Sequence, residues 1–411
     1  MHSPIPAHRK TTCVPSFQGL VFAYATTIGR MQMIYLDNAA TSFPKPRRVA
    51  EEQMRCMQFY GGNPGRASHA LALAAAEKIY ECREELASFF GSPNPENVVF
   101  TLNTTMAINT AIKGLLHRGD HVLLSDMEHN AVFRPIYKLA RDGGITYDVF
   151  DTFPSTPSRT KEMVLASILE KIRPTTRMLI CAHASNICSA MLPLCEIGAL
   201  CRKKGILFVV DAAQSAGHLP IDMEKMQIDA LCVPGHKGLW GPQGCGALVL
   251  GNGIVADTLM EGGSGYNSLE GSMPSDAPER YEAGTLPTPA IAGLLEGVRE
   301  VRRVGIDHIH DHECALTKRL SERLLAMPKV KLYAPHHAGS VLLFSMDDIS
   351  ADRVGAFLNE RGICVRTGFH CAALAHATLG TPPSGAVRVS PSLFNTAAQM
   401  DAVADALRDL L

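Results

Sequence analysis

Polar residues follow five predicted core strands of this sequence, at the points where the apolar runs end. They are Thr104-Thr105, His129, Asn186, Asp211 and Lys237. Because the carboxyl ends of parallel strands share one edge of a sheet, we expect these side chains to meet in one crevice. One polar residue after a strand is more often a cap or a turn, but five such points with complementary chemistry indicate a ligand site.

The chemistry of these side chains predicts one kind of ligand. Thr104 and Thr105 open a helix, where free N–H groups and two hydroxyls suit a phosphate, although the same pair alone would also make a plain N-cap. His129 offers a flat ring, and Asp211 can pair with a cationic ring nitrogen. Lys237 can form an imine when its amine is neutral. Together these features predict a site for pyridoxal 5'-phosphate (PLP).

The strands expected to position these residues are short apolar runs bounded by turn signals. They cover residues 98–100, 121–124, 146–150, 177–181, 206–210, 230–233 and 247–250. Helical patterns alternate with them, over 46–58, 68–90, from about 106, from about 131, within 155–172 and over 194–204. This alternation predicts an α/β fold with a mostly parallel, helix-covered sheet.

Composition shifts divide the chain into four expected parts. Residues 1–32 read as a disordered tail or a misassigned start, because their apolar patch is short for a secretory signal. Residues 33–55 are expected to join the small domain, 56–288 to form the large PLP-binding domain, and 289–411 to form a smaller α+β domain. Pro287-Thr288-Pro289 marks the boundary, and residues 290–328 are strongly helical in pattern.

The composition excludes several classes of function. The 411 residues carry a net charge of -1, with 46% hydrophobic and 19% charged residues, so we expect neither nucleic acid nor a membrane surface as a partner. No apolar run approaches the roughly 18 residues that span a bilayer. The twelve cysteines include no C-x-x-C pair. We therefore expect buried, reduced thiols in a cytoplasmic protein without a zinc site.

Several motifs together resemble the class V aminotransferase family, and within it the cysteine desulfurase branch, especially its SUF-type group. The resemblance covers about residue 33 to the C-terminus. It rests on Thr104-Thr105, Glu128-His129, Asp211-Ala212-Ala213-Gln214, Gly235-His236-Lys237, Arg280-Tyr281-Glu282-Ala283-Gly284-Thr285 and Arg366-Thr367-Gly368-Phe369-His370-Cys371. It implies the fold-type I architecture of PLP-dependent enzymes and a homodimer.

The resemblance also implies how the cofactor would be held. Lys237 is similar to the PLP lysine, Asp211 to the partner of the pyridine nitrogen, and His129 to the residue stacked on the ring. Gln214 would lie near the ring hydroxyl, and Asn186 would face the substrate or the cofactor. The implied phosphate contacts are Thr104, Thr105, His236 and, from across the dimer, Thr285.

For the reaction, the resemblance implies that Arg388 anchors the substrate carboxylate, which suits bidentate guanidinium geometry, with Arg366 also on the substrate side. Cys371 matches the catalytic cysteine, and Arg366 and His370 nearby could lower the pKa of its thiol. His370, Cys371 and His376 are not expected to bind a metal, because no fourth ligand is evident.

Two positions depart from the family pattern. Pro234 stands where SUF-type enzymes commonly carry a phosphate-binding serine, so one phosphate contact is missing or replaced. Phe369 stands where a histidine is common, which makes the cysteine loop less polar and could change which acceptor docks there.

The function expected from the resemblance is the conversion of L-cysteine to L-alanine, with the sulfur left on Cys371 as a persulfide. An acceptor protein or small thiol would collect it for iron–sulfur clusters or thio-cofactors. Selenocysteine lyase, cysteine sulfinate desulfinase, and a transaminase or epimerase that does not use Cys371 remain alternatives. A non-catalytic scaffold or a nucleotide-binding protein is a third class, although no G-x-G-x-x-G opens a helix after a strand.

Overall fold

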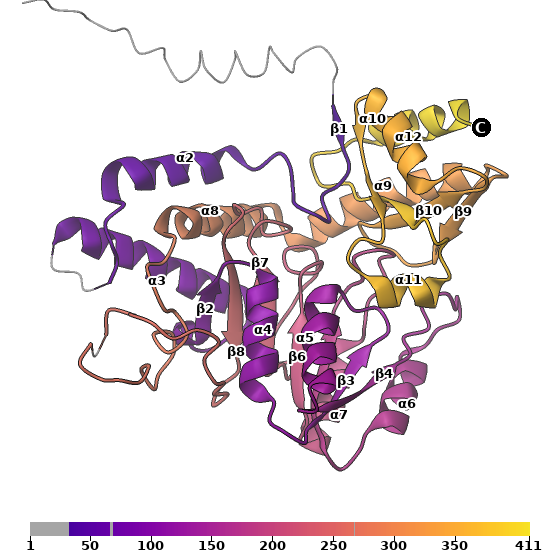
Figure 1. The fold of residues 1–411 in the computed structure, drawn as a ribbon. Helices are drawn as coiled ribbons and strands as arrows, with labels where there is room; N and C mark the ends of the chain where they lie inside the picture. Colours follow the sequence, from indigo (N-terminus) through magenta and orange to yellow (C-terminus); the bar gives the residue numbers. More distant parts are fainter. Residues whose placement is uncertain (1–32, 66–68, 267) are drawn as a thin grey trace, which may run out of the picture.

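The computed structural model describes residues 33–65, 69–266 and 268–411, and the strands within them form three sheets (Figure 1). The expected tail, 1–32, lies outside the described residues. The largest sheet lies at the centre, and the two smaller sheets lie together with the C-terminal helices.

The central sheet has seven strands in the order β2-β8-β7-β6-β5-β3-β4. Its strands are β2 (Val98–Thr101), β3 (His121–Ser125), β4 (Thr146–Phe150), β5 (Thr176–Ala182), β6 (Leu207–Asp211), β7 (Ala230–Pro234) and β8 (Gly246–Leu250). Only β8 runs against its neighbours, so β2 again points the same way as β7. The expected α/β fold with a mostly parallel sheet is confirmed, and the strand ends that carry polar residues share one edge.

Helices bury both faces of this sheet. Successive residues of each strand point to opposite faces, so neighbouring residues of one strand pack in different cores. In β6, Phe208 packs with one apolar core and Val209 with the other, and both are fully buried. One face is covered by α3 (Ala70–Phe90), α6 (Lys161–Lys171), α7 (Leu194–Lys204) and α8 (Thr288–Val304), and the other by α4 (Thr104–Leu115) and α5 (Asn130–Arg141). Burial of each large apolar side chain in this way stabilises the folded state by about 1.5–3 kcal/mol.

The helical stretch expected over residues 290–328 consists of two helices. Gly305, at φ +92°, separates α8 from α9 (Ile306–Leu325). This backbone angle is open to glycine but unfavourable for residues with a side chain, so the chain changes direction there. As a result α8 lies on the central sheet, whereas α9 packs in the C-terminal core.

The C-terminal part builds a four-stranded antiparallel sheet in the order β12-β13-β10-β9. Its strands are β9 (Val330–Tyr333), β10 (Leu342–Met346), β12 (Arg366–Gly368) and β13 (Ala386–Val389), and its helices besides α9 are α10 (Ala351–Glu360), α11 (Ala373–Leu379) and α12 (Ala397–Asp409). This is the smaller α+β part expected from the sequence.

The N-terminal segment joins both parts of the molecule. β1 (Ile34–Tyr35) pairs in parallel with β11 (Ile363–Cys364), beside the small sheet. α2 (Arg47–Arg55), which continues as a π-helical turn (Cys56–Tyr60), packs on α8 instead. Residues 36–46 therefore cross from one part to the other, and the exact division of the chain into domains stays a proposal.

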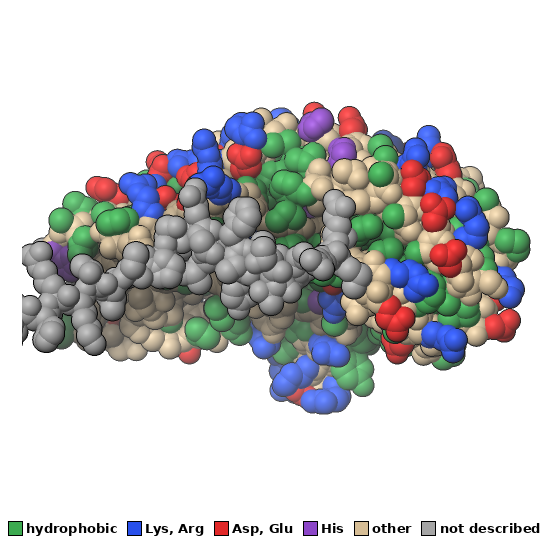
Figure 2. Space-filling model, turned by 90° about the horizontal axis from the view of Figure 1, so that it is seen from above, with side chains coloured by type: hydrophobic (Ala, Val, Ile, Leu, Met, Phe, Trp, Pro, Cys, Tyr) green, Lys and Arg blue, Asp and Glu red, His purple; other side chains and the backbone are tan. Residues whose placement is uncertain are grey.

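The charged surface is mixed in sign. On the face seen from above, acidic and basic side chains are interspersed over the C-terminal part (Figure 2). Ion pairs such as Arg319–Asp401 (2.7 Å) and Arg323–Asp405 (2.5 Å) join α9 to α12 there. Within the described ranges, no helix is both long enough and apolar enough to cross a membrane.

Candidate active site

The loop after β7 brings Lys237 to the carboxyl edge of the central sheet. It turns tightly, because the Gly235 N–H donates to the Cys245 carbonyl (2.9 Å) and the Trp240 N–H to the Lys237 carbonyl (2.9 Å). Glycine is required at 238, since a Cβ there would lie 2.3 Å from the Ala216 carbonyl oxygen. This close approach fixes the direction in which Lys237 leaves the loop.

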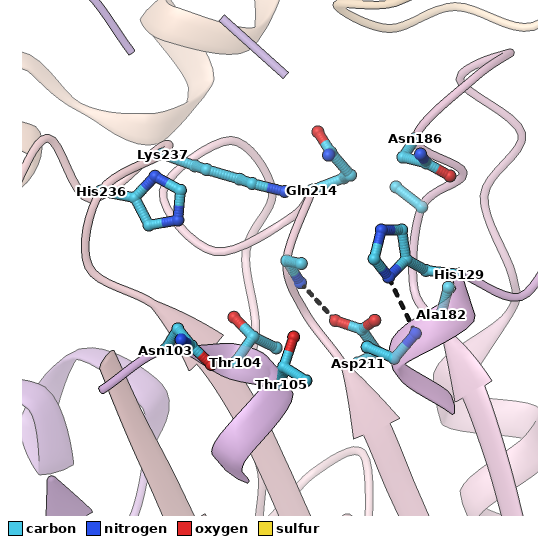
Figure 3. A pocket seen from close by; sticks show the side chains of 13 residues that line it. Asn103, Thr104, Thr105, His129, Ala182, Asn186, Asp211, Gln214, His236 and Lys237 are labelled. Atoms are coloured by element: carbon cyan, nitrogen blue, oxygen red, sulfur yellow. Dashed lines mark hydrogen bonds between the residues drawn. The ribbon is translucent and has the colours of Figure 1, made fainter. Parts of the chain in front are cut away.

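The residues predicted from the strand ends, and two implied by the family resemblance (Gln214 and His236), line one cavity at this edge (Figure 3). They are Thr104, Thr105, His129, Asn186, Asp211, Gln214, His236 and Lys237. The Lys237 side chain points into the cavity from one side, His129 stands on the other side, and Asp211 rises from the floor. Asn103, Ala182, Ala184 and Ala213 complete much of the lining, and the sequence pattern did not single them out.

Burial brings the Lys237 amine toward its neutral form. The pKa of this amine is lowered to about 8, mainly by burial; Asp211 opposes the shift, and the Arg388 and Arg366 cations contribute to it. Burial also raises the pKa of Asp211, which the Ala213 N–H (2.9 Å) and the Lys237 cation partly offset. Only a neutral amine can attack an aldehyde, and a lowered pKa makes the neutral amine of a buried lysine available near neutral pH.

His129 is held as a neutral ring of one tautomer. Its Nδ1 accepts a hydrogen bond from the Ala131 N–H (3.0 Å) at the start of α5, so the proton lies on Nε2. Burial and the Lys237 cation lower its pKa to about 4. Behind it the buried Glu128 carboxyl accepts from Ser125 and from the Ala182 N–H (2.9 Å), and burial raises its pKa to about 8. The ring therefore offers the cavity a flat, uncharged face.

The end of the cavity at α4 is suited to an anion. α4 begins at Thr104, and its N-cap Asn103 accepts from the Met106 N–H (3.0 Å), which leaves the first N–H groups of the helix without intrahelical partners. Within the described residues, the buried Thr104 Oγ1 and His236 Nδ1 have no hydrogen-bond partner. A phosphate at this end would satisfy such groups, so the residues present fit the phosphate of PLP.

The sequence pattern missed the segment of residues 37–45, named here the N-terminal strap. It crosses beside the cavity, where the Ala39 carbonyl accepts from Gln214 Nε2 (2.9 Å). Ser42 Oγ donates to the Lys237 carbonyl (2.9 Å), and Lys45 Nζ donates to the His236 carbonyl (2.7 Å). The strap therefore fixes the backbone of the lysine loop and the side chain of Gln214.

Arg388 lies on β13 of the small sheet and is almost fully buried. Its two Nη atoms donate to the Asn186 carbonyl (3.1 Å) and to Asp37 of the strap (2.7 Å), while its Nε has no partner among the described residues. Arg366 lies directly opposite on β12. The sequence offered one indication of this ion pair, because Asp37 follows a strand just as Asp211 does. Its partner Arg388, however, lies 351 residues away in the sequence.

Cys371 lies in an exposed turn beside the cavity. The hollow that contains it shares Thr105 and His129 with the cavity. Two hydrogen bonds tie the turn to the large part of the molecule, from the Asn130 N–H to the Cys371 carbonyl (2.7 Å) and from Asn186 Nδ2 to the His370 carbonyl (2.9 Å). The thiol is therefore placed at the mouth of the site.

His370 does not act as expected on this thiol. Burial and the Arg388 cation lower the pKa of its imidazole to about 3, so the ring is neutral and supplies no positive charge. The ring nitrogens face His376 and the Arg366 carbonyl instead. The positive charge expected from His370 beside the thiol is therefore absent, because desolvation outweighs any benefit of charging this ring.

Thr285 does not reach the cavity of its own chain. It lines a separate hollow with Asn63 and Tyr266, and Asn63 Nδ2 donates to its hydroxyl at 3.5 Å. A phosphate contact by Thr285 would therefore have to come from a second copy of the chain. Within the described part of the chain, His, Cys, Asp and Glu side chains form no group of three that could hold a metal ion.

Comparison with known proteins places the chain in a family. The model of the family "Aminotransferase class-V" matches residues 34–403. A protein of Methanothermobacter thermautotrophicus named "Probable cysteine desulfurase" is 32% identical over 92% of this chain and 94% of its own length. A "Cysteine desulfurase" of Salmonella agona is 31% identical over 91% and 92%. The solved cysteine desulfurase of Thermococcus onnurineus NA1 is 29% identical, with a TM-score of 0.84, over 92% of this chain and 94% of that one.

Proposed function

The chain belongs to the class V aminotransferase family and is an enzyme of the cysteine desulfurase type, and from this premise we propose that it moves the sulfur of L-cysteine onto Cys371 and releases L-alanine. The observation that carries this proposal is the placement of an exposed cysteine in a hollow that shares Thr105 and His129 with the Lys237 cavity. This places a thiol beside the site where the substrate amine would be held.

PLP is the cofactor that the cavity fits. Lys237 would hold it, Asp211 would pair with its ring nitrogen, and His129 would lie against the ring. Thr104, Thr105 and His236 would donate to its phosphate, and Asn103 lines the same cavity, where it could replace the contact that Pro234 cannot make. When bound, PLP withdraws electrons from the α-carbon of the substrate.

The residues around the cofactor have separate tasks. Lys237, with its pKa lowered to about 8, is able to take a proton from the substrate α-carbon and to return it. Arg388 anchors the substrate carboxylate, for which its unpartnered Nε–H is available. Arg366, directly opposite on β12, adds a second positive charge on the substrate side. Asn186 holds both Arg388 and the cysteine turn, through its carbonyl and its amide group.

The bonds and electrons of the sulfur transfer balance without an outside oxidant. The Cys371 thiolate attacks the substrate sulfur, so an S–S bond forms and the substrate C–S bond breaks. The electron pair of that bond stays on the substrate β-carbon, which takes up a proton and becomes the methyl group of alanine. The persulfide then gives its outer sulfur to the thiolate of an acceptor protein or small thiol, and the Cys371 thiolate leaves. Iron–sulfur or thio-cofactor assembly would use that sulfur.

A product assay tests this proposal. With L-cysteine and a reducing thiol, the parent should form alanine and sulfide in equal amounts, whereas Cys371→Ala should lose nearly all sulfide release. Cys195→Ala is the matched control, because Cys195 is also exposed but lies on α7, outside the cavity. Unchanged sulfide release by Cys371→Ala would refute the persulfide route. Alanine formation from selenocysteine or cysteine sulfinate by that variant would favour the alternatives that do not use Cys371.

A further inference from the structure

A row of hydrogen bonds joins the cysteine turn to α11 and to the residue that follows its C-terminal end. His370 Nε2 lies 3.3 Å from the Arg366 carbonyl, and His370 Nδ1 lies 3.1 Å from His376 Nε2. His376 Nδ1 in turn lies 2.8 Å from Thr381 Oγ1. The planes of the two imidazole rings are nearly parallel, at 14°, and the ring centroids lie 5.3 Å apart. We name these four residues the cysteine-turn relay.

Because both rings are buried and neutral, the carbonyl at one end fixes the direction of the hydrogen bonds along the relay. A carbonyl can only accept, so His370 Nε2 donates to it and His370 Nδ1 accepts from His376 Nε2–H. His376 Nδ1 is then an acceptor as well, and the Thr381 hydroxyl donates to it at 2.8 Å, with the His376 carbonyl as a more distant second acceptor at 3.3 Å. Each neutral ring is therefore held in one tautomer. Burial and the Arg388 cation keep them neutral, with pKa values of about 3 for His370 and about 4 for His376.

The turn that the relay supports has an unfavourable backbone. His370 and Cys371 are consecutive residues with side chains, at φ +50° and +54°. This region is sparsely populated for residues other than glycine and persists only where the surroundings hold it. The relay holds the His370 side chain, while Asn186 and Asn130 hold the two carbonyls of the turn.

We propose that His376 and Thr381 are positioning residues that hold the Cys371 thiol in place for sulfur transfer, acting through the His370 ring. Both lie outside the cavity, and neither contacts the thiol. His376 is buried on α11, and Thr381 closes the C-terminal end of that helix by donating its N–H to the His376 carbonyl (3.2 Å). This proposal rests on the role of Cys371 given above.

The expected consequence is a loss in the rate of sulfur transfer rather than in substrate binding. A reacting atom misplaced by about 1 Å can cost about 100-fold in rate. Breaking the relay should therefore lower kcat for L-cysteine by about 10- to 100-fold. The KM should change by no more than about threefold, because Arg388 and Lys237 stay in place.

The experiment compares two pairs of variants of the full-length enzyme loaded with its cofactor. His376→Phe and Thr381→Val remove the hydrogen bonds and keep the size of the side chain, whereas His376→Gln and Thr381→Ser keep a donor and an acceptor. Thr378→Val is the control for the loss of a threonine hydroxyl at α11, since Thr378 is exposed, lies outside the relay and donates instead to the Asp126 carbonyl (3.4 Å). Steady-state kinetics give kcat and KM, and hydrogen exchange of the peptide covering residues 366–373 reports the mobility of the turn without reference to activity.

The proposal predicts that His376→Phe and Thr381→Val lower kcat and speed exchange in the turn, and that Thr381→Ser restores both. Unchanged kcat with unchanged exchange would overturn it, as would equal losses in Thr381→Ser and Thr381→Val. If the parent formed no alanine from L-cysteine, the proposed function would fail, and exchange alone would decide whether the relay holds the turn. Should His376→Phe not fold, the Thr381 pair decides.

Discussion

At the residue scale, the protonation state of the buried Lys237 amine sets the pH range in which the site can react with an aldehyde. Burial lowers its pKa from 10.5 to about 8, so its neutral fraction rises through pH 8 instead of through pH 10.5. Uptake of PLP by the cofactor-free protein should therefore speed up between about pH 7 and 9 and then level off. Stopped-flow absorbance in the visible range measures this uptake. A rate that keeps rising toward pH 10.5 would contradict the lowered pKa.

A second prediction at the residue scale concerns Asp37, whose role toward Arg388 the sequence pattern did not indicate. Its carboxylate orients the buried Arg388 guanidinium, so Asp37→Ala should raise the KM for L-cysteine by about tenfold or more, since truncating a buried charged partner costs about 2–5 kcal/mol. Asp37→Asn keeps an acceptor oxygen and should retain most of the affinity. Steady-state kinetics of both variants provide the check. An equal rise in KM for the two substitutions would contradict the idea that the oxygen of residue 37 orients Arg388 as a hydrogen-bond acceptor.

The strand-end rule predicted much of the site because it depends on local sequence alone. Asp211 and Lys237 follow apolar runs, and the topology of a parallel sheet then brings them together. Asp37 also follows a strand, but its role, like that of His376, could not be predicted because it comes from partners that only the fold supplies. The charge of His370 was misjudged for the same reason, since its burial is a tertiary property that keeps the ring neutral.

At the element scale, the lysine loop depends on its close packing against the turn that contains Gly217. Gly238→Ala would place a Cβ 2.3 Å from the Ala216 carbonyl and 2.5 Å from the His218 ring. Strain of about 1–3 kcal/mol should lower the melting temperature by several degrees and reduce the bound cofactor. Calorimetry and visible absorbance measure the two effects. Gly271→Ala is the control, because a Cβ there meets nothing within 4 Å; a similar loss in both variants would contradict this account.

The helices and strands were largely predictable, and their interruptions were not. The break at Gly305 turns one expected helical stretch into α8 and α9, which belong to different cores. Periodicity runs through this point without a signal, because both helices bury one apolar side. The strap was likewise invisible as an element, since its contacts with Gln214 and Lys237 join parts of the chain far apart in sequence.

At the scale of the whole molecule, we propose that two copies of the chain complete each site. Thr285 lines a hollow away from its own cavity together with Tyr266, which is 59% exposed, and Leu269, three residues after Tyr266 in the sequence, is fully exposed. Apolar surface of this kind is often an interface. Light scattering should therefore give twice the chain mass of 44.3 kDa.

Mixed dimers test whether Thr285 serves the partner's site. In a dimer of one Lys237→Ala chain and one Thr285→Ala chain, a contact across the interface leaves one site with both groups intact. That dimer should bind one PLP as tightly as the parent does. A contact within the chain would leave no intact site, and cofactor retention on dialysis would then match that of the Thr285→Ala homodimer. The cofactor content per dimer, read from absorbance, separates the two results.

The most direct measurement of the central claim is where the sulfur goes. The enzyme is given one equivalent of L-cysteine without a reductant, quenched with an alkylating reagent, digested and analysed by mass spectrometry. The proposed chemistry predicts that the peptide containing Cys371 gains the mass of one sulfur atom, in proportion to the alanine formed, while the peptide containing Cys195 does not. Alanine formed in full with no added sulfur on Cys371 would contradict it.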